Sequence, residues 1–389
     1  MGERPLKILF AAPAYWPAAS FGGPIAVMRE LASELTGRGH EVDVLTTSLT
    51  GVTQPGSART RRDVVDGARV HYLATPLRFR WMGVTPSLPL WIRRLERPDV
   101  VHVFGYRDPL GTLAAAWCRV ARVPYVFEAL GMFRPKLRKV RLKRLLDHTV
   151  CRGVPEGARL LVAVSRIERQ EYLDGGHDAA RIALRPNGFP TPYVPRDPGR
   201  LRRRLGLAAT DTIVLSVGRV ARGKGLELLV EAMPTLPAGT HLVIAGPDDG
   251  HGMTAELLRR RQRLGLESRV HLLGPVTASD VSELYGGADV CALVSAHESF
   301  GMVAAEAAAT GAAVLVTDTC GVAECFDASS GVVVPYAAAP IEEALRALLA
   351  DGARRGALGA GARRLASSLS WQRAADLQER IYRDALASP

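Results

Sequence analysis

The sequence predicts an α/β protein made of two Rossmann-like, doubly wound domains that face each other across a central cleft. Strand-like β-branched runs alternate with helical patterns in the N-terminal half, and the alternation restarts in the C-terminal half. The 389 residues are 47% hydrophobic, enough to bury two cores. Between the halves, the segment 189–198 contains four prolines, which oppose helix and sheet alike and therefore suit a linker.

Each half contains six expected strands. Those of the N-terminal half are 6–12, 41–46, 70–74, 99–104, 124–127 and 160–164, with helices such as 25–38 and 110–122 between them. Those of the C-terminal half are 212–217, 241–245, 269–273, 290–294, 313–316 and 331–334. We place the boundary near Pro195, which gives domains at residues 1–194 and 195–370. Doubly wound sheets bind ligands outside the carboxyl ends of their strands, so the loops after these strands are the expected sites.

Two glutamates, Glu298 and Glu306, bracket a glycine turn after the strand at 290–294. A helix that begins near Phe300 leaves its first amides without intrahelical acceptors, and these donors and the helix dipole favour an anion such as a diphosphate. The amides are those of Gly301, Met302 and Val303. Glu306, further along the helix, can accept hydrogen bonds from ribose hydroxyls, while Glu298 faces the other end of the ligand. The alternative is an ordinary strand-to-helix junction with two surface glutamates.

A glycine-rich basic turn, 218–225, follows the strand at 212–217 and precedes a helical pattern. Arg219 offers a planar fork of donors for phosphate oxygens, and Lys224 offers a mobile point charge. The spacing lacks the terminal Gly-Lys-Ser/Thr of a P-loop, so a triphosphate hydrolase is not supported. Alone the turn also fits a solvated loop. Its place in the same α/β segment as Glu298 and Glu306 favours a shared diphosphate site.

Together, the segments 218–225 and 298–306 resemble the donor signature of family 4 retaining glycosyltransferases, which have the GT-B fold. The resemblance extends over nearly the whole chain. The further similar segments are 20–26 (the N-terminal glycine loop that faces the donor phosphates), 185–189 (the strand-end Pro-Asn-Gly), 271–276 (the strand beneath the nucleotide base) and 370–382 (the closing helix). We expect the final helix, 371–389, to pack back on the first domain.

The resemblance implies transfer of a sugar from a nucleoside diphosphate sugar to an acceptor hydroxyl, with retention of the anomeric configuration. The typical donor is a UDP-hexose or UDP-N-acetylhexosamine. The acceptor is a lipid-linked, polysaccharide or small-molecule hydroxyl, as in envelope polysaccharide, glycolipid or natural-product glycoside biosynthesis. The sequence contains no Asp-x-Asp triplet, so neither a metal nor a cofactor is expected, and basic residues would take the metal's place.

The expected site residues follow from these motifs. Arg219 and Lys224 would stabilise the leaving diphosphate, and Glu298 would hold the sugar hydroxyls. The expected donor-binding residues are Gly22, Gly23, Asn187, Gly218, Val276, Thr277, Ser299, Phe300, Gly301, Met302, Val303 and Glu306.

The acceptor side departs from the family pattern. Many relatives carry a histidine after the strand beside the cleft, where this chain has Leu130. His102, Glu128 and Ser165 are the polar candidates there, although a strand-end histidine is often structural.

Two rival functions stay open. A sugar-nucleotide epimerase on the same architecture would need no acceptor, and a catalytically silent sugar-nucleotide-binding partner would bind a donor without turnover.

The surplus of positive charge, +11 with a pI near 9.8, calls for an anionic partner. Between Arg134 and Arg144 seven basic residues interleave with apolar ones and no acid, which fits either a solvated helix face or a peripheral contact with an anionic membrane or lipid phosphate. Nucleic-acid binding is not expected, because aromatic residues are 6% and no recognition motif occurs.

The five scattered cysteines suggest buried free thiols. No apolar run is long enough to span a membrane, and no secretion signal is recognised. We therefore expect a cytoplasmic protein, peripheral at the inner face of the membrane if the basic segment binds lipid.

Overall fold

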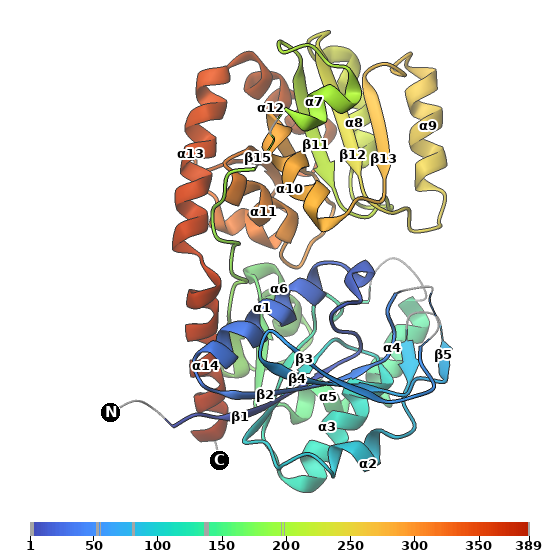
Figure 1. Cartoon of the computed structure of the whole chain (residues 1–389), viewed down its shortest axis with the longest axis vertical. Helices are drawn as coiled ribbons and strands as arrows, with labels where there is room; N and C mark the ends of the chain where they lie inside the picture. Colours follow the sequence, from blue (N-terminus) through green and yellow to red (C-terminus); the bar gives the residue numbers. More distant parts are fainter. Residues whose placement is uncertain are drawn as a thin grey trace. The chain divides into compact units, whose positions relative to one another are not determined.

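The computed structural model describes two compact units, each an α/β fold (Figure 1). The first unit is Met1–Gly188 with Trp371–Pro389, and the second is Phe189–Ser370. The residues described are 4–51, 54, 56–79, 82–135, 140–195, 197 and 199–387. The predicted pair of doubly wound, Rossmann-like folds is confirmed.

An eight-stranded sheet forms the centre of the first unit, in the order β10-β9-β8-β7-β1-β2-β4-β3. Its strands are β1 (Lys7–Ala12), β2 (Glu41–Thr47), β3 (Arg61–Val65), β4 (Ala68–Leu73), β7 (Val100–Phe104), β8 (Tyr125–Glu128), β9 (Leu160–Ala163) and β10 (Ile182–Leu184). Every neighbouring pair is parallel except β3 and β4. β3 was not predicted from the sequence, because its polar residues are almost all exposed and show no apolar alternation. The short β10 and the hairpin of β5 (Leu77–Phe79) with β6 (Met82–Val84) were not predicted either.

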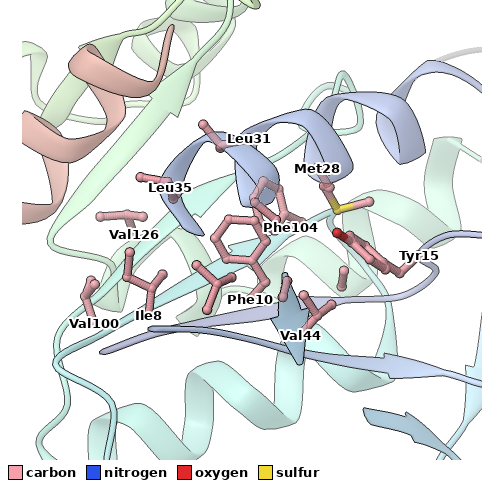
Figure 2. Packing of buried hydrophobic residues seen from close by; sticks show 14 of the residues in the cluster. Ile8, Phe10, Tyr15, Met28, Leu31, Leu35, Val44, Val100, Phe104 and Val126 are labelled. Atoms are coloured by element: carbon pink, nitrogen blue, oxygen red, sulfur yellow. The ribbon is translucent and has the colours of Figure 1, made fainter. Parts of the chain in front are cut away.

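Helices cover both faces of this sheet, because successive strand residues point to opposite sides. The helices are α1 (Gly23–Gly37), α2 (Leu88–Ile92), α3 (Pro109–Ala121), α4 (Val140–His148), α5 (Gly153–Gly157), α6 (Arg166–Asp174) and α14 (Trp371–Ala387). On one face Phe10 and Phe104 pack edge to face, with ring centroids 4.9 Å apart, beneath Met28 and Leu31 of α1 (Figure 2). Strands and helices α3 and α5 form the second core on the opposite face.

The closing helix α14 packs on the first unit beside α1 (Figure 1). Arg38, at the end of α1, forms an ion pair of 2.6 Å with Asp376 of α14. On its inner side, α14 contributes Ile381 and Tyr382 to the core that contains Phe10. The helix therefore completes one face of the N-terminal sheet although it follows the second unit in the sequence.

A six-stranded parallel sheet forms the second unit, in the order β13-β12-β11-β14-β15-β16. Its strands are β11 (Thr212–Val217), β12 (Thr240–Ala245), β13 (Val270–Gly274), β14 (Val290–Leu293), β15 (Ala313–Thr317) and β16 (Val332–Val334). Its helices are α7 (Arg200–Leu205), α8 (Leu226–Ala232), α9 (Met253–Arg263), α10 (Ala278–Gly287), α11 (Met302–Thr310), α12 (Ala338–Ala350) and α13 (Gly352–Ser368). The strand order reverses between β11 and β14, which is where such sheets bind ligands.

The chain passes between the units at Gly188–Phe189 and again at Ser370–Trp371. A side chain on Gly188 would lie 2.5 Å from the Cα of Trp371, so the outgoing and returning chains pack closely in the first unit. The proline-rich segment, where the sequence placed the boundary, belongs to the second unit. Its Tyr193 amide donates to the Ala309 carbonyl at 3.2 Å, and a side chain on Gly286 would meet the ring of Pro195.

All five cysteines are free, with Cys325 partly buried and the rest buried. Among the residues described, no helix combines the length and apolar character that crossing a bilayer requires. The middle of the basic segment Arg134–Arg144, residues 136–139, lies outside the described residues, and α4 begins at Val140.

Candidate functional site

The two predicted diphosphate motifs meet at the strand switch point of the second unit. The turn 218–225 follows β11, and the segment 295–301 follows β14, its direct neighbour in the sheet. The two loops are hydrogen-bonded to each other, because the Ala296 amide donates to the Gly223 carbonyl at 2.8 Å. Gly225 has φ 65°, and a Cβ there would lie only 2.0 Å from the Val294 carbonyl oxygen. Only glycine lets the turn approach β14 this closely.

Lys224 and Glu298 form an ion pair between the two loops. Their side chains are 27% and 21% exposed, so both remain accessible to a ligand. Ser295 donates its hydroxyl to the same carboxylate at 3.0 Å. The Glu298 backbone is also fixed, because its amide donates to Thr319 at 3.2 Å and its carbonyl accepts from Gly321 at 3.0 Å. A cation and an acceptor of hydroxyl protons are thus held side by side.

Arg219 has a fixed backbone and a side chain that is exposed. The neighbouring Val220 donates its amide to the Pro247 carbonyl at 2.9 Å and accepts from Asp249 at 3.2 Å. Among the described residues the Arg219 guanidinium has neither a hydrogen-bond partner nor an ion-pair partner. Its five donors are therefore available to an anion.

Helix α11 begins at Met302, after Gly301 in a left-handed conformation with φ 111°. A Cβ on Gly301 would lie 2.7 Å from the Leu293 side chain, so a glycine is required at this position before the helix. Phe300 is buried, and its carbonyl accepts from the Val322 amide at 2.7 Å. The helix start is therefore later than the expected Phe300, but Met302 and Val303 occupy the first turn, whose amides have no intrahelical acceptor.

Glu306 lies one turn further along α11 and accepts a hydrogen bond of 2.8 Å from the Tyr285 hydroxyl. Burial raises the pKa of this carboxyl, and the bond from Tyr285 opposes the rise. A carboxylate fixed in this way can accept further bonds from the hydroxyls of a ribose. Tyr285 was not singled out from the sequence, where nothing distinguishes it from a core tyrosine.

The expected base-lining residues lie after β13. Thr277 caps α10, because its hydroxyl accepts from the Asp280 amide at 3.2 Å. Val276 precedes it in the same loop, at the carboxyl end of the sheet. Both lie in the second unit with the two diphosphate loops.

In the first unit the glycine loop follows β1, which lies between β7 and β2 at that sheet's own switch point. Gly22 has φ 89° and caps α1, whose first residue is Gly23. The predicted glycine loop therefore stands at a helix start.

His102, Glu128 and Asn187 join in one buried network. Glu128 and His102 are completely buried, which differs from the expected role of polar groups open to an acceptor. Arg185, also completely buried, forms an ion pair with Glu128 and donates to the Asn187 side chain at 3.0 Å. His102 lies 3.5 Å from Glu128 and binds the Tyr382 hydroxyl of α14 at 2.8 Å. Burial lowers the pKa of His102, and the Glu128 carboxylate opposes this only in part.

Ser165 and the loop after β8 are linked through Glu168. The Ser165 hydroxyl accepts from the Glu168 amide at 3.2 Å, and Glu168 accepts in return from Val164 at 3.0 Å. The Ser-x-x-Glu spacing of a capping box was readable in the sequence, but the Glu168 carboxylate binds the amide of Val164, one residue before the capping Ser165, instead of the Ser165 amide. Glu168 also accepts from the Gly131 amide at 2.8 Å, beside Leu130, whose φ is 53°. Burial raises the pKa of Glu168 to about 7. Leu130, where the family resemblance led us to expect histidine, thus has an unfavourable backbone conformation that Glu168 helps to fix.

Within the described part of the chain, no group of three or more His, Cys, Asp or Glu side chains is placed to hold a metal ion. Cys320 and Cys325, the two cysteines that follow the Glu298 segment in the sequence, therefore belong to no such group.

Comparison with known proteins identifies both halves. Residues 22–188 match the family described as glycosyl transferase 4-like domain, and residues 199–365 match glycosyl transferases group 1. The D-inositol 3-phosphate glycosyltransferase of Xylanimonas cellulosilytica is 32% identical over 394 residues, covering 94% of this chain and 92% of that protein. The enzyme of the same name from Kineococcus radiotolerans is 31% identical over 410 residues, covering 94% and 91%.

Solved structures agree on the fold. Anabaena HepE in complex with UDP-glucose has a TM-score of 0.76 at 20% identity, covering 97% of this chain and 99% of that one. The catalytic domain of Arabidopsis thaliana starch synthase IV, bound to ADP and acarbose, has a TM-score of 0.79 at 16% identity, covering 99% and 100%. With two family matches that span most of the sequence and two relatives aligned end to end, the chain belongs to the family 4 glycosyltransferases of the GT-B fold.

Proposed function

We propose that this glycosyltransferase moves a sugar from a UDP-sugar to an acceptor hydroxyl, with retention of the anomeric configuration and without a metal ion. The observation that carries the proposal is the meeting of Lys224 and Glu298 at the switch point of the second unit, beside the first-turn amides of α11. Cations and free amides suit a diphosphate, and a carboxylate suits sugar hydroxyls. HepE, with the same fold, has been solved with UDP and with UDP-glucose, which supports the choice of nucleotide.

In the proposed reaction the bond between the sugar's anomeric carbon and the β-phosphate oxygen breaks. The acceptor oxygen forms the new bond to that carbon on the same face, and its proton passes to the departing phosphate. Negative charge grows on the diphosphate, so the Lys224 ammonium and the Arg219 guanidinium stabilise the transition state more than the ground state. These two groups do the work that a metal ion does in other transferases.

Donor binding would exchange the partners of the ion pair. The diphosphate replaces Glu298 as the partner of Lys224, and the released carboxylate, still held by the buried Ser295 hydroxyl, accepts hydrogen bonds from the sugar hydroxyls. Glu306, oriented by Tyr285, would bind the ribose hydroxyls. The ion pair therefore keeps both groups in place before the donor arrives.

For the acceptor, relatives that align over 94% of the chain are named for D-inositol 3-phosphate, so this cyclitol is the first acceptor to test. Lipid-linked and polysaccharide acceptors should be tested beside it. Glu128 and His102 are completely buried and contact Arg185 and Tyr382, so in this proposal they hold the end of β8 in place rather than touch the acceptor.

The test begins with thermal-shift titration of UDP-, ADP- and GDP-sugars, followed by acceptor trapping with the best donor and mass spectrometry of the product. The anomeric configuration is read from the proton coupling constant of the product, and the reaction is repeated with EDTA. We expect a retained linkage and an unchanged rate with EDTA. An isomerised donor without an acceptor requirement would replace this proposal by an epimerase, and donor binding without turnover would replace it by a silent binding partner.

We also propose a cytoplasmic location with a peripheral contact to anionic membranes through the basic segment Arg134–Arg144. The support is its seven basic residues without an acid, and in the described part Arg141 is exposed on α4. Flotation with vesicles of neutral and anionic phospholipid at physiological salt tests this. Equal recovery of the protein with both kinds of vesicle would contradict it.

A further inference from the structure

A second basic site lies at the opposite end of the N-terminal sheet from the loops described above. A cavity of about 860 Å³ is lined by the first residues of two neighbouring strands, Tyr125 of β8 and Leu160 of β9. Leu386, near the end of α14, closes one side. Since Glu128 is the last residue of β8, about 10 Å of strand separates it from the cavity. The cavity therefore lies outside the carboxyl-end region of this sheet.

The lining of this cavity is strongly basic. It contains four arginines, Arg119, Arg122, Arg159 and Arg181, and one acid, Glu156. The carboxylate of Glu156 forms an ion pair of 2.6 Å with Arg152, which does not line the cavity. The positive charge of the lining is thus not offset within it, and such a concave surface attracts anions.

The carbonyls at the helix ends around the cavity already have arginine donors. Two helices, α3 and α5, end here, and their last carbonyls would otherwise repel an anion. Arg181 already donates to the carbonyls of Pro155 and Glu156 at 3.2 and 2.9 Å. Arg97, from outside the cavity, donates to the carbonyl of Ala121 at 3.1 Å. Arg119 and Arg122 are therefore not needed to cap these helices.

Two arginines are available to a ligand. The side chains of Arg119 and Arg122 are exposed, and neither makes a hydrogen bond or an ion pair with any residue that the structure describes. Arg119 is nevertheless held in place, because it lies over α5 where Gly153 and Gly157 have no side chains. A Cβ at Gly153 would lie 2.6 Å from the Arg119 guanidinium, and one at Gly157 would lie 2.9 Å from its Cδ. Glycines thus make room for a preorganised, unpaired guanidinium.

We propose that this cavity binds a phosphorylated ligand, with the forked guanidinium groups of Arg119 and Arg122 as its main contacts. Planar forks of donors match phosphate oxygens, and two of them lining one cavity favour a diphosphate or a phosphomonoester over a single small anion. The ligand is either a soluble phosphate compound or the headgroup of a phospholipid, since both present the same oxygens. Both this site and the donor site are proposals, and neither depends on the other.

The test titrates the full-length protein with inorganic pyrophosphate by calorimetry at constant ionic strength. It uses the Arg219→Ala/Lys224→Ala background, so that the proposed donor site does not contribute. In this background we expect saturable binding, weakened at least tenfold by Arg119→Gln/Arg122→Gln. The control is Arg354→Gln/Arg364→Gln, two exposed arginines of α13 that remove the same charge and should leave binding unchanged. Circular dichroism checks that each variant is folded.

A second arm uses vesicles that contain phosphatidic acid, compared with vesicles of phosphatidylcholine alone. Binding of free pyrophosphate assigns the site to a soluble ligand, and binding of phosphatidic acid vesicles alone assigns it to a headgroup, provided that Arg119→Gln/Arg122→Gln abolishes it. Equal weakening by the two double variants, or no binding in either arm, would overturn the proposal. The Arg119→Gln/Arg122→Gln variant with an intact donor site should keep its transfer activity. The transfer assay of Lys224→Ala therefore tests the proposed function, and the binding assays test this cavity alone.

Discussion

Replacing Lys224 by alanine should slow sugar transfer about 10²- to 10³-fold while the protein stays folded. Removing one preorganised donor from a developing oxyanion typically costs about 3–4 kcal/mol of transition-state stabilisation. At about 1.4 kcal/mol per factor of ten, this gives the stated range. The loss in stability is much smaller, because the Lys224 and Glu298 side chains are 27% and 21% exposed, and a pair with this access to solvent contributes at most about 1 kcal/mol.

The assay measures UDP release at saturating acceptor over a range of donor concentrations. If Lys224 acts mainly on charge that develops as the diphosphate leaves, kcat should fall more than KM rises. Arg354→Ala is the matched control, since it removes an exposed charge from α13 in the same unit. A value of kcat/KM within threefold of wild type for Lys224→Ala, with the control also unchanged, would refute the role assigned to Lys224.

Three further changes test other parts of the structure. Glu306→Gln should raise the donor KM while kcat changes less, because it would weaken the proposed contact with the ribose. Initial rates over a range of donor concentrations measure both constants, and an unchanged KM would contradict the contact. Gly225→Ala should lower the melting temperature more than Gly223→Ala, because only the first adds a Cβ that meets a backbone oxygen, at 2.0 Å, although both glycines have positive φ; equal losses would show that the close approach is unimportant. Glu168→Gln should gain stability relative to wild type as pH rises from about 4.5 to about 7. The folded carboxyl, with its pKa raised to about 7, keeps a proton that the unfolded chain releases near 4.5, so wild-type stability falls across this window, by up to about 3 kcal/mol. Denaturant titrations of both proteins at several pH values measure the difference.

Strands that are buried on both faces were predictable, because they read as continuous apolar runs between loops. β1, β7 and β15 are almost entirely buried and were found within a residue or two. β3 was not, because it is an edge strand whose exposed polar residues gain their order from pairing with β4. From composition alone, the proline-rich segment 189–198 was predicted as the linker. It belongs to the second unit because it contacts α10 and α11, which lie about a hundred residues further along the chain.

The two loops of the proposed donor site were predictable, since each lies in a short segment that reads locally as strand, glycine turn and helix. What the sequence could not give is the pairing across the segments. Lys224 and Glu298 are far apart in the chain, and only the adjacency of β11 and β14 brings them into contact. The same holds for Tyr285, which reaches Glu306 from another helix.

On the acceptor side the sequence predicted polar groups at strand ends, but it could not predict that Glu128 and His102 are completely buried. Glu128 would be costly to bury as a lone charge, and the equally buried Arg185 supplies its counter-charge. Burial raises the pKa of this carboxyl, but the nearby Arg185 and the His102 hydrogen bond lower it more, so the group stays charged. Because Arg185 also holds Asn187 and His102 reaches Tyr382, the network ties the end of β8 to the segment just before the first crossing between units and to the middle of α14. A polar residue at a strand end can therefore either hold neighbouring segments together or contact a substrate. Because Glu128 and His102 are completely buried, the structural role explains them better.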